Sequence, residues 1–270
     1  MTIQTPIAQP VLIARPEPGV AMLTLDRPGA RNALSQAVMT ALSAALAALA
    51  ADNDVRAIVL AANGTAFCAG HDLKELTAHR TDSDSGRAFY TETMTQCSAL
   101  MQSIVACPKP VIAAVEGIAT AAGCQLVATC DLAVAAETAT FATPGVNIGL
   151  FCSTPMVALS RNVPRKRAME MLLLGEALSA RDAAAYGLVN RVVPHAEVRA
   201  AALGMARTIA AKSSATVAIG KAAFYAQLEQ PLAQAYAHAA QVMVTNMMMA
   251  DAEEGICAFL DKRPPNWRGC

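Results

Sequence analysis

The chain has 270 residues, of which 54% are hydrophobic, 16% charged and only 4% aromatic. This length suits one large α/β domain with a sizeable core, and the composition excludes a disordered chain. The 21 basic and 21 acidic residues cancel, which excludes a global attraction for nucleic acid. No apolar run is free enough of charged and turn residues to span a bilayer, so no membrane partner is expected.

Eight cysteines are scattered along the chain without a C-x-x-C pair, several of them within apolar runs. This usage is typical of reduced, buried packing residues and argues against a disulfide framework or a zinc site, so no metal is expected. The first ten residues, MTIQTPIAQP, show neither a signal-peptide pattern nor an Arg-rich amphipathic leader. We therefore expect a cytoplasmic protein.

The predicted elements begin with a hairpin over residues 10–29, where two strands flank a Pro/Gly turn. Apolar residues at helical spacing then predict an amphipathic helix over 35–52. A continuous apolar run predicts a strand at 55–62, of the kind that is covered on both faces. A helix is expected around 85–105, followed by strands at 110–115 and 132–136. Strands and helices thus alternate around one core.

The last third of the chain is mostly helical, interrupted by a strand within 187–194. Residues 251–263 contain the pattern of a capping box, with Asp251 at the cap and Glu254 three residues later. The Ala- and Met-rich stretch 233–250 is interpreted as packing surface, part of which we expect to contact another subunit.

Two turns made of small residues, FCAGHDL (67–73) and IATAAGCQL (118–126), each follow a strand and precede a helix. Backbone N–H groups at a helix start have no partner within the helix and lie at the positive end of its dipole. Two such groups aimed at one point form an oxyanion hole. Alternatively, the small residues only allow tight packing between strand and helix. Motifs of dinucleotide, P-loop, α/β-hydrolase and zincin sites are absent.

Together with these turns, five segments resemble the crotonase, or enoyl-CoA hydratase/isomerase, superfamily over nearly the whole chain. They are LDRPGARNALS (25–35), FCAGHDLKEL (67–76), residues 111–150, residues 168–194 and EEGICAFLDKR (253–263). Residues 120–128 and 141–155 look most like the branch of enoyl-CoA hydratase domain-containing proteins.

The resemblance implies an α/β fold, a crotonase-like spiral of ββα turns with a helical C-terminal trimerisation region. Residues 1–200 would form the core and 201–270 the oligomerisation region, giving a homotrimer or a dimer of trimers. It also implies an acyl-CoA thioester as substrate or ligand, no tightly bound cofactor, and enoyl-CoA hydratase or isomerase activity in fatty acid metabolism.

By motif position, the resemblance implies that the backbone N–H groups of His71 and Ala122 form the oxyanion hole. Ala122 stands where the family usually has glycine. The residues implied to contact coenzyme A are Arg31, Ala33, Ala69, Asp72, Leu73 and Lys74, with Phe259 and Lys262 contributed by a neighbouring subunit.

The two glutamates that serve hydration in this family correspond to Gln125 and Gly145 here. An amide cannot shuttle a proton at neutral pH, and glycine has no side chain. Because a positioned acid or base contributes about 10²–10⁴-fold, hydration should be inefficient. The position used by the family's isomerases, within 150–153, also lacks a carboxylate.

Four residues could replace the missing carboxylates, namely His71, Cys152, Glu116 and Asp72. Each has a structural alternative. His71 would act only through its backbone, and Cys152 would be a packed thiol. Glu116 would be a surface or interface carboxylate, and Asp72 would be a helix cap. Two hypotheses therefore stand. One is an enzyme that stabilises an enolate of acyl-CoA, and the other is a protein that binds acyl-CoA without turnover.

Overall fold

The computed structural model of the chain describes residues 9–270, so most of the segment from which the absence of a leader was predicted lies outside the described residues. The expected N-terminal hairpin is present as β1 (Val11–Glu17) and β2 (Gly19–Leu25), which pair antiparallel. A left-handed Gly19, with φ +77°, makes the tight turn possible.

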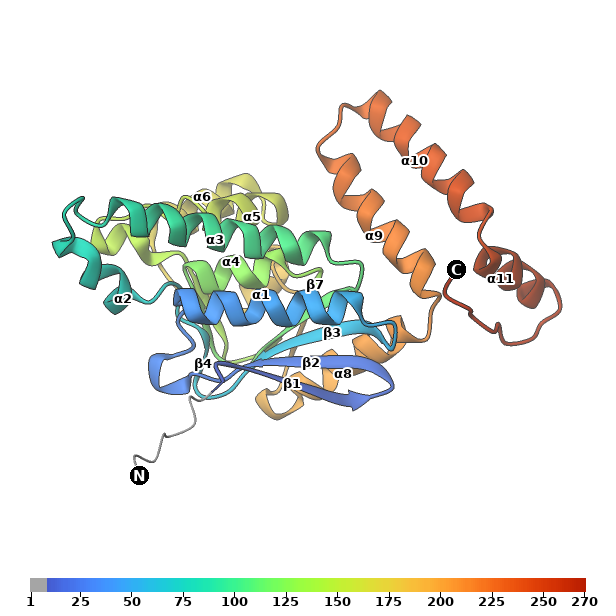
Figure 1. Cartoon of the computed structure of the whole chain (residues 1–270), viewed down its shortest axis with the longest axis horizontal. Helices are drawn as coiled ribbons and strands as arrows, with labels where there is room; N and C mark the ends of the chain where they lie inside the picture. The colour runs from blue at the N-terminus through green and yellow to red at the C-terminus, as the bar shows by residue number, and fades with distance from the viewer. Residues whose placement is uncertain (1–8) are drawn as a thin grey trace.

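The larger sheet has six strands in the order β1-β2-β3-β5-β7-β10. The strands after β2 are parallel, and they are β3 (Val55–Ala62), β5 (Val111–Val115), β7 (Leu132–Ala136) and β10 (Arg191–Val193). Every residue of β5 is buried. Figure 1 shows why, since α1 and α8 lie on opposite sides of this sheet. The prediction that the strand at 55–62 is covered on both faces is confirmed by the burial of β3.

The smaller sheet has the order β4-β6-β8-β9. Its strands are β4 (Ala66–Cys68), β6 (Ile118–Thr120), β8 (Thr140–Ala142) and β9 (Leu178–Ser179). Each of β3, β5 and β7 in the larger sheet is followed by a short strand of the smaller sheet and then by a helix. These helices are α2 (Leu73–Ala78), α4 (Ala122–Thr129) and, after a 3-10 turn, α5 (Pro155–Asn162). The repeating unit is therefore ββα, as expected.

The remaining helices of the core cover the two sheets. Helix α1 (Gln36–Ala51) begins where predicted, because the Ser35 hydroxyl accepts a hydrogen bond of 3.3 Å from Val38 N–H. The others are η1 (Pro28–Ala30), η2 (His79–Thr81), α3 (Arg87–Ala106), η3 (Pro144–Ile148), α6 (Arg165–Leu174), α7 (Ala180–Ala185), η4 (His195–Glu197) and α8 (Val198–Ala210).

Residues 214–270, here called the appendage, project from the core (Figure 1). They contain α9 (Ser214–Leu228), α10 (Leu232–Met247) and α11 (Ala250–Leu260). The predicted division at residue 200 falls inside α8, whose buried Ala202 and Ala206 pack on the larger sheet. The helices that stand apart therefore begin at Ser214.

The predicted capping box is wrong. Helix α11 begins at Ala250, so Asp251 lies inside the first turn, and Met249 holds the cap position without a side-chain bond. The Asp251 carboxylate instead accepts hydrogen bonds from the N–H groups of Arg268 and Gly269, at 2.7 and 2.9 Å. The chain end, which local sequence pattern cannot place, supplies these partners.

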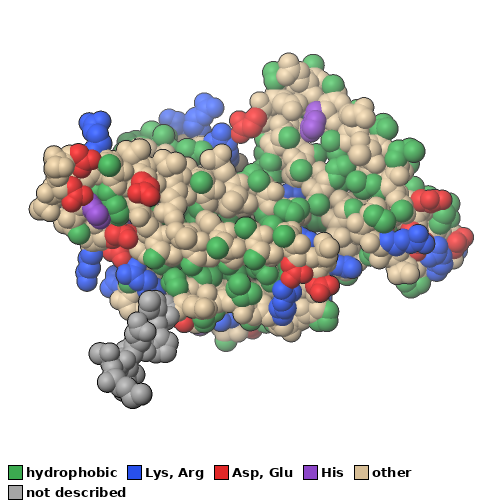
Figure 2. All heavy atoms as spheres, in the orientation of Figure 1, with side chains coloured by type: hydrophobic (Ala, Val, Ile, Leu, Met, Phe, Trp, Pro, Cys, Tyr) green, Lys and Arg blue, Asp and Glu red, His purple; other side chains and the backbone are tan. Residues whose placement is uncertain are grey.

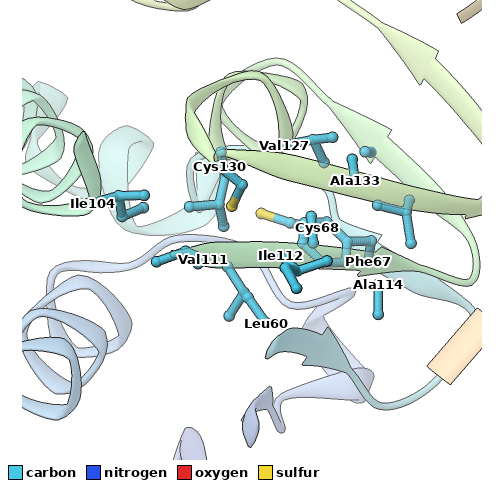
Figure 3. Close-up of a cluster of buried hydrophobic side chains, with 14 of the residues drawn as sticks. Leu60, Phe67, Cys68, Ile104, Val111, Ile112, Ala114, Val127, Cys130 and Ala133 are labelled. Carbon is cyan, nitrogen blue, oxygen red and sulfur yellow. The ribbon is translucent and has the colours of Figure 1, made fainter. Parts of the chain in front are cut away.

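The cysteines behave as predicted, since six of the eight are buried and all are free thiols. Figure 3 shows Cys68 and Cys130 within a buried cluster beside Ile112 of β5 and Val127 of α4. Within residues 9–270 no helix is long and apolar enough to cross a bilayer, and no group of acidic, His and Cys side chains is arranged to hold a metal ion.

Candidate functional site

The two turns of small residues lie against each other. A Cβ atom placed on Gly70 would lie 2.9 Å from Ala121 Cβ and 3.3 Å from the Ala122 nitrogen. A Cβ on Gly123 would lie only 2.1 Å from the Cys68 carbonyl oxygen. The small residues are thus required by the close approach of two backbone segments, one after β4 and the other after β6.

Each turn places a left-handed residue directly before a free donor. Gly70 (φ +88°) precedes His71, and Ala121 (φ +49°, ψ −119°) precedes Ala122, the first residue of α4. An alanine in this backbone region stores about 1–3 kcal/mol of strain, which is typical of functional turns. In the described part of the chain, neither the His71 N–H nor the Ala122 N–H donates to a protein acceptor. Both donors are available to a ligand.

The residues expected to contact coenzyme A meet beside the first turn. Ala69 N–H donates to Arg31 O at 3.0 Å, and Asp72 N–H donates to Leu34 O at 3.3 Å. This pairing brings the 31–34 segment alongside residues 69–72. Leu73 and Lys74 follow as exposed residues at the start of α2.

Two of the expected contacts lie elsewhere in this chain. Phe259 and Lys262 are exposed residues at the end of α11, and Figure 1 shows α11 at the opposite end of the molecule from α2. The structure therefore does not join them to the site within one chain. Their expected role remains one that only a neighbouring subunit's copy could fulfil.

Asp72 is committed to local structure. Its carboxylate caps α2 by accepting from Lys74 and Glu75 N–H, and it pairs with Arg27 at 2.7 Å. Burial raises the pKa of Asp72, but the hydrogen bonds from Arg27 and the α2 amides outweigh it and hold the pKa below its usual range. The cap predicted from the sequence is present. Sequence reasoning did not identify Arg27, whose only signal was its place in the LDRPG segment.

Gln125 lies one turn into α4 with 4% of its surface exposed. Its side-chain oxygen is 4.0 Å from the Cys97 thiol of α3, and its amide nitrogen donates to no described group. The side chain thus keeps an unused donor. An amide can orient water or a substrate oxygen there but cannot accept a proton.

Gly145 lies in a turn that has no room for a side chain. A Cβ atom would stand 2.6 Å from the Leu150 carbonyl oxygen and 2.9 Å from the Cys152 sulfur. The turn is closed by a hydrogen bond of 2.9 Å from Leu150 N–H to Gly145 O. A carboxylate at this position would require the 145–152 backbone to move, so more than one substitution separates this turn from one that holds glutamate.

The other two replacement candidates are also engaged. Glu116 accepts a hydrogen bond of 2.9 Å from Arg199, which holds the carboxylate in an ion pair. Burial raises the pKa of the Cys152 thiol, so it is protonated near neutral pH and a poor nucleophile. Both therefore fit the structural alternatives given for them.

Two polar side chains in this region have no partner. Both ring nitrogens of His71 are buried without a hydrogen bond among the described residues, and so is the hydroxyl of Thr143, two residues before Gly145. Burial lowers the pKa of His71, opposed in part by the Leu34 carbonyl, which lies near the ring without the geometry of a hydrogen bond. No sequence signal identified Thr143.

The fold of the whole chain is similar to that of several solved structures. An enoyl-CoA hydratase of Mycobacterium smegmatis superposes with a TM-score of 0.90 at 54% identity, covering 96% of this chain and 98% of that one. Human enoyl Coenzyme A hydratase domain-containing protein 3 superposes with a TM-score of 0.91 at 48% identity, over 96% of this chain and all of that one.

Sequence comparison finds relatives of the same kind and corrects the predicted location. The curated human enoyl-CoA hydratase domain-containing protein 3 is 49% identical over 254 residues, which are 94% of this chain and 82% of that protein. It and the rat, mouse and Xenopus relatives are named mitochondrial, which contradicts the predicted cytoplasmic location. Free cysteines exclude only an oxidising compartment and do not separate one reducing compartment from another.

The Enoyl-CoA hydratase/isomerase family model matches residues 15–270, and the chain belongs to this family, the crotonase superfamily.

Proposed function

We propose that this protein binds an acyl-CoA thioester and stabilises negative charge on its carbonyl oxygen between the N–H groups of His71 and Ala122. The observation that carries this proposal is the pair of touching turns, each with a left-handed residue before a free donor. Donors held by strained backbone are already oriented when charge develops, so they need no reorganisation during the reaction. The family acts on coenzyme A thioesters without a tightly bound cofactor.

Recognition of the coenzyme A portion is assigned to the segment beside the first turn. Arg31 and Lys74 are exposed cations on the two paired segments, and charge-assisted hydrogen bonds to phosphate are their expected contribution. Ala33, Ala69, Asp72 and Leu73 shape the backbone between them. Phe259 and Lys262 of a neighbouring subunit would complete the contact.

Assembly into a homotrimer, or a dimer of trimers, is part of this proposal. Neither α9 nor α10 contains a buried residue, and large apolar side chains such as Tyr236 and Met243 are 72% and 59% exposed. Figure 2 shows hydrophobic side chains distributed over the appendage. Exposed apolar surface of this extent is typical of a subunit interface. Sedimentation of the full chain tests this part.

Efficient hydration of enoyl-CoA is not the proposed reaction. Gln125 cannot move a proton, and the Gly145 turn is filled by Leu150 and Cys152. The reaction class supported best is chemistry through a thioester enolate. The second candidate is an acyl-CoA binding or regulatory protein without turnover, and the filled Gly145 turn is the observation that favours it.

A pair of ligands tests the oxyanion hole without any substitution. Butyryl-CoA has the thioester carbonyl, and its S-butyl thioether analogue lacks only that oxygen. Two hydrogen bonds of about 0.5–1.5 kcal/mol each predict roughly 5- to 150-fold tighter binding of the thioester, measured by calorimetry. Equal affinities would contradict the oxyanion hole, and no binding of either would contradict the acyl-CoA assignment. Crotonyl-CoA hydration at rates typical of hydratases would contradict the account of Gln125 and Gly145.

A further inference from the structure

We propose that the imidazole of His71 is the proton-transfer group of this site, acting on the carbon next to the thioester carbonyl in place of the absent carboxylates. This inference rests on the proposed function, because it requires a thioester bound at the His71 and Ala122 donors. It assigns to one residue two tasks, since the backbone N–H binds the carbonyl oxygen while the side chain exchanges a proton with the adjacent carbon.

The first observation is that the ring has no partner. Nδ1 and Nε2 of His71 are both buried, and neither forms a hydrogen bond with any described residue. Buried polar atoms in folded proteins are nearly always paired, so an imidazole with two free nitrogens requires a specific explanation. A ring nitrogen kept free to exchange a proton with a bound substrate is such an explanation.

The second observation is the location of the residue. Gly70, its neighbour, lies against Ala121 and Ala122, so His71 stands where the two turns meet. An isolated parallel bridge between Leu34 and His71 holds the backbone of this residue against the 31–34 segment. The ring and the N–H both belong to the residue at this junction, so a thioester bound at the N–H would lie beside the residue that carries the imidazole.

The third observation concerns the other titratable groups of the site, which are engaged or protonated. Asp72 is held by Arg27 and the α2 amides, and Glu116 by Arg199. Burial raises the pKa of Cys97 to about 11 and that of Cys68 to about 12, so both thiols keep their protons near neutral pH. Among these candidates, only His71 has unused capacity to accept a proton.

The step balances without a further reactant. A neutral imidazole has one nitrogen with a free lone pair and one with a proton. Burial favours this neutral form of His71. The lone pair takes the proton from the α-carbon, the C–H electrons form the carbon–carbon double bond of the enolate, and the carbonyl π electrons move to the oxygen held by the two donors. Return of a proton from the imidazolium to the α-carbon restores the thioester.

Exchange of the α-protons of butyryl-CoA in D₂O, followed by NMR, measures this step. The variants His71→Leu and His71→Asn keep the backbone N–H, so they retain the oxyanion donor while losing the base. We expect each to slow exchange by about 10²-fold or more, with the dissociation constant for butyryl-CoA changed by less than threefold. His79→Asn, which removes a partly exposed imidazole paired with Asp82, is the matched control and should exchange like the parent.

Thermal unfolding separates catalysis from a structural role. An apolar replacement for an unpaired buried polar group is neutral or stabilising, so His71→Leu should melt at the same temperature as the parent or higher. A structural histidine would give a lower melting temperature instead.

Four results are decisive. Slower exchange with retained binding and stability supports the inference. Binding without exchange in the parent, or exchange that is unchanged in both His71 variants, overturns it and leaves the proposed binding function intact. Failure of the parent to bind butyryl-CoA overturns the inference and the proposed function together.

Discussion

The core and the appendage use similar apolar residues in opposite ways. In the core, β5 is entirely buried and β3 nearly so, and backbone segments approach until a single methyl group on Gly123 would collide with a carbonyl oxygen. In the appendage, α9 and α10 contain no buried residue. An apolar pattern in the sequence therefore predicts a packing face but not whether the same chain or another copy covers it.

Hydrogen bonds and an ion pair join the core and the appendage. Lys221 of α9 donates to Asp131 at 2.7 Å and to the Ile104 carbonyl at 2.9 Å, and Tyr225 donates to the other Asp131 oxygen at 2.9 Å. At the chain end, the Trp267 indole donates to the Ala211 carbonyl at 3.0 Å. Directional bonds of this kind fix the orientation of the appendage where little apolar surface is shared.

Removing the ion pair between Lys221 and Asp131 should cause the largest decrease in the free energy of unfolding. The Lys221 side chain is only 7% exposed, so Lys221→Met leaves the Asp131 carboxylate without its cation in a largely buried position. Loss of one partner of a buried pair costs about 3–5 kcal/mol. Urea unfolding should show this decrease, whereas Lys166→Met on the exposed side of α6 should change stability by less than about 0.5 kcal/mol. Equal stability of the two variants would show that this ion pair does not hold the appendage.

A glycine pair sharpens the contrast between crowded and open backbone. Gly123→Ala places a methyl group 2.1 Å from the Cys68 carbonyl oxygen and should lower the free energy of unfolding by about 3 kcal/mol. Gly204 lies inside α8, where a Cβ atom would have no other atom within 4 Å. Gly204→Ala should therefore raise the free energy of unfolding by about 1 kcal/mol, because alanine favours the helix. The two changes in unfolding free energy should therefore have opposite signs. A neutral Gly123→Ala would mean that the two turns are free to separate.

Much of the core could be predicted because its signals are local. Residues 55–62 form the predicted strand, and the α1 cap at Ser35 needs a partner only three residues away. Strands β4, β6 and β8 have three residues each, too few to show a period, and only the family resemblance implied them. The candidate site residues likewise come from motif position, and their roles stay predictions.

What could not be predicted are contacts set by the folded chain, several of them between residues far apart in the sequence. Arg27 reaches Asp72 across 45 positions, and the chain end fills the bonding capacity of Asp251. The Leu150 carbonyl that fills the Gly145 turn is only five residues away, but the turn itself, which has no sequence period, sets that contact. The two free nitrogens of His71 also have no sequence signature, because absence of a partner is a property of the folded surroundings.

The smallest predicted effect is a loss of stability at the end of the appendage at acidic pH. Glu254 accepts two hydrogen bonds from Arg263, at 2.7 and 2.9 Å, and one of 2.7 Å from Asn266 N–H. These bonds lower the pKa of Glu254 to about 2 from its ordinary 4.5. A depressed pKa contributes stability that is present above pH 4.5 and is lost as the pH falls from 4.5 towards 2.

Trp267, the only tryptophan of the chain, follows Asn266 and reports this region by fluorescence. Its emission should shift to the red as the pH falls through this window, before the core unfolds by circular dichroism. Glu254→Gln should show the shifted emission already at pH 7 and little further change on acidification, because the amide lacks the charge that Arg263 pairs with. Coincident loss of the indole signal and of core structure in the parent would instead mean that the two regions unfold as one unit.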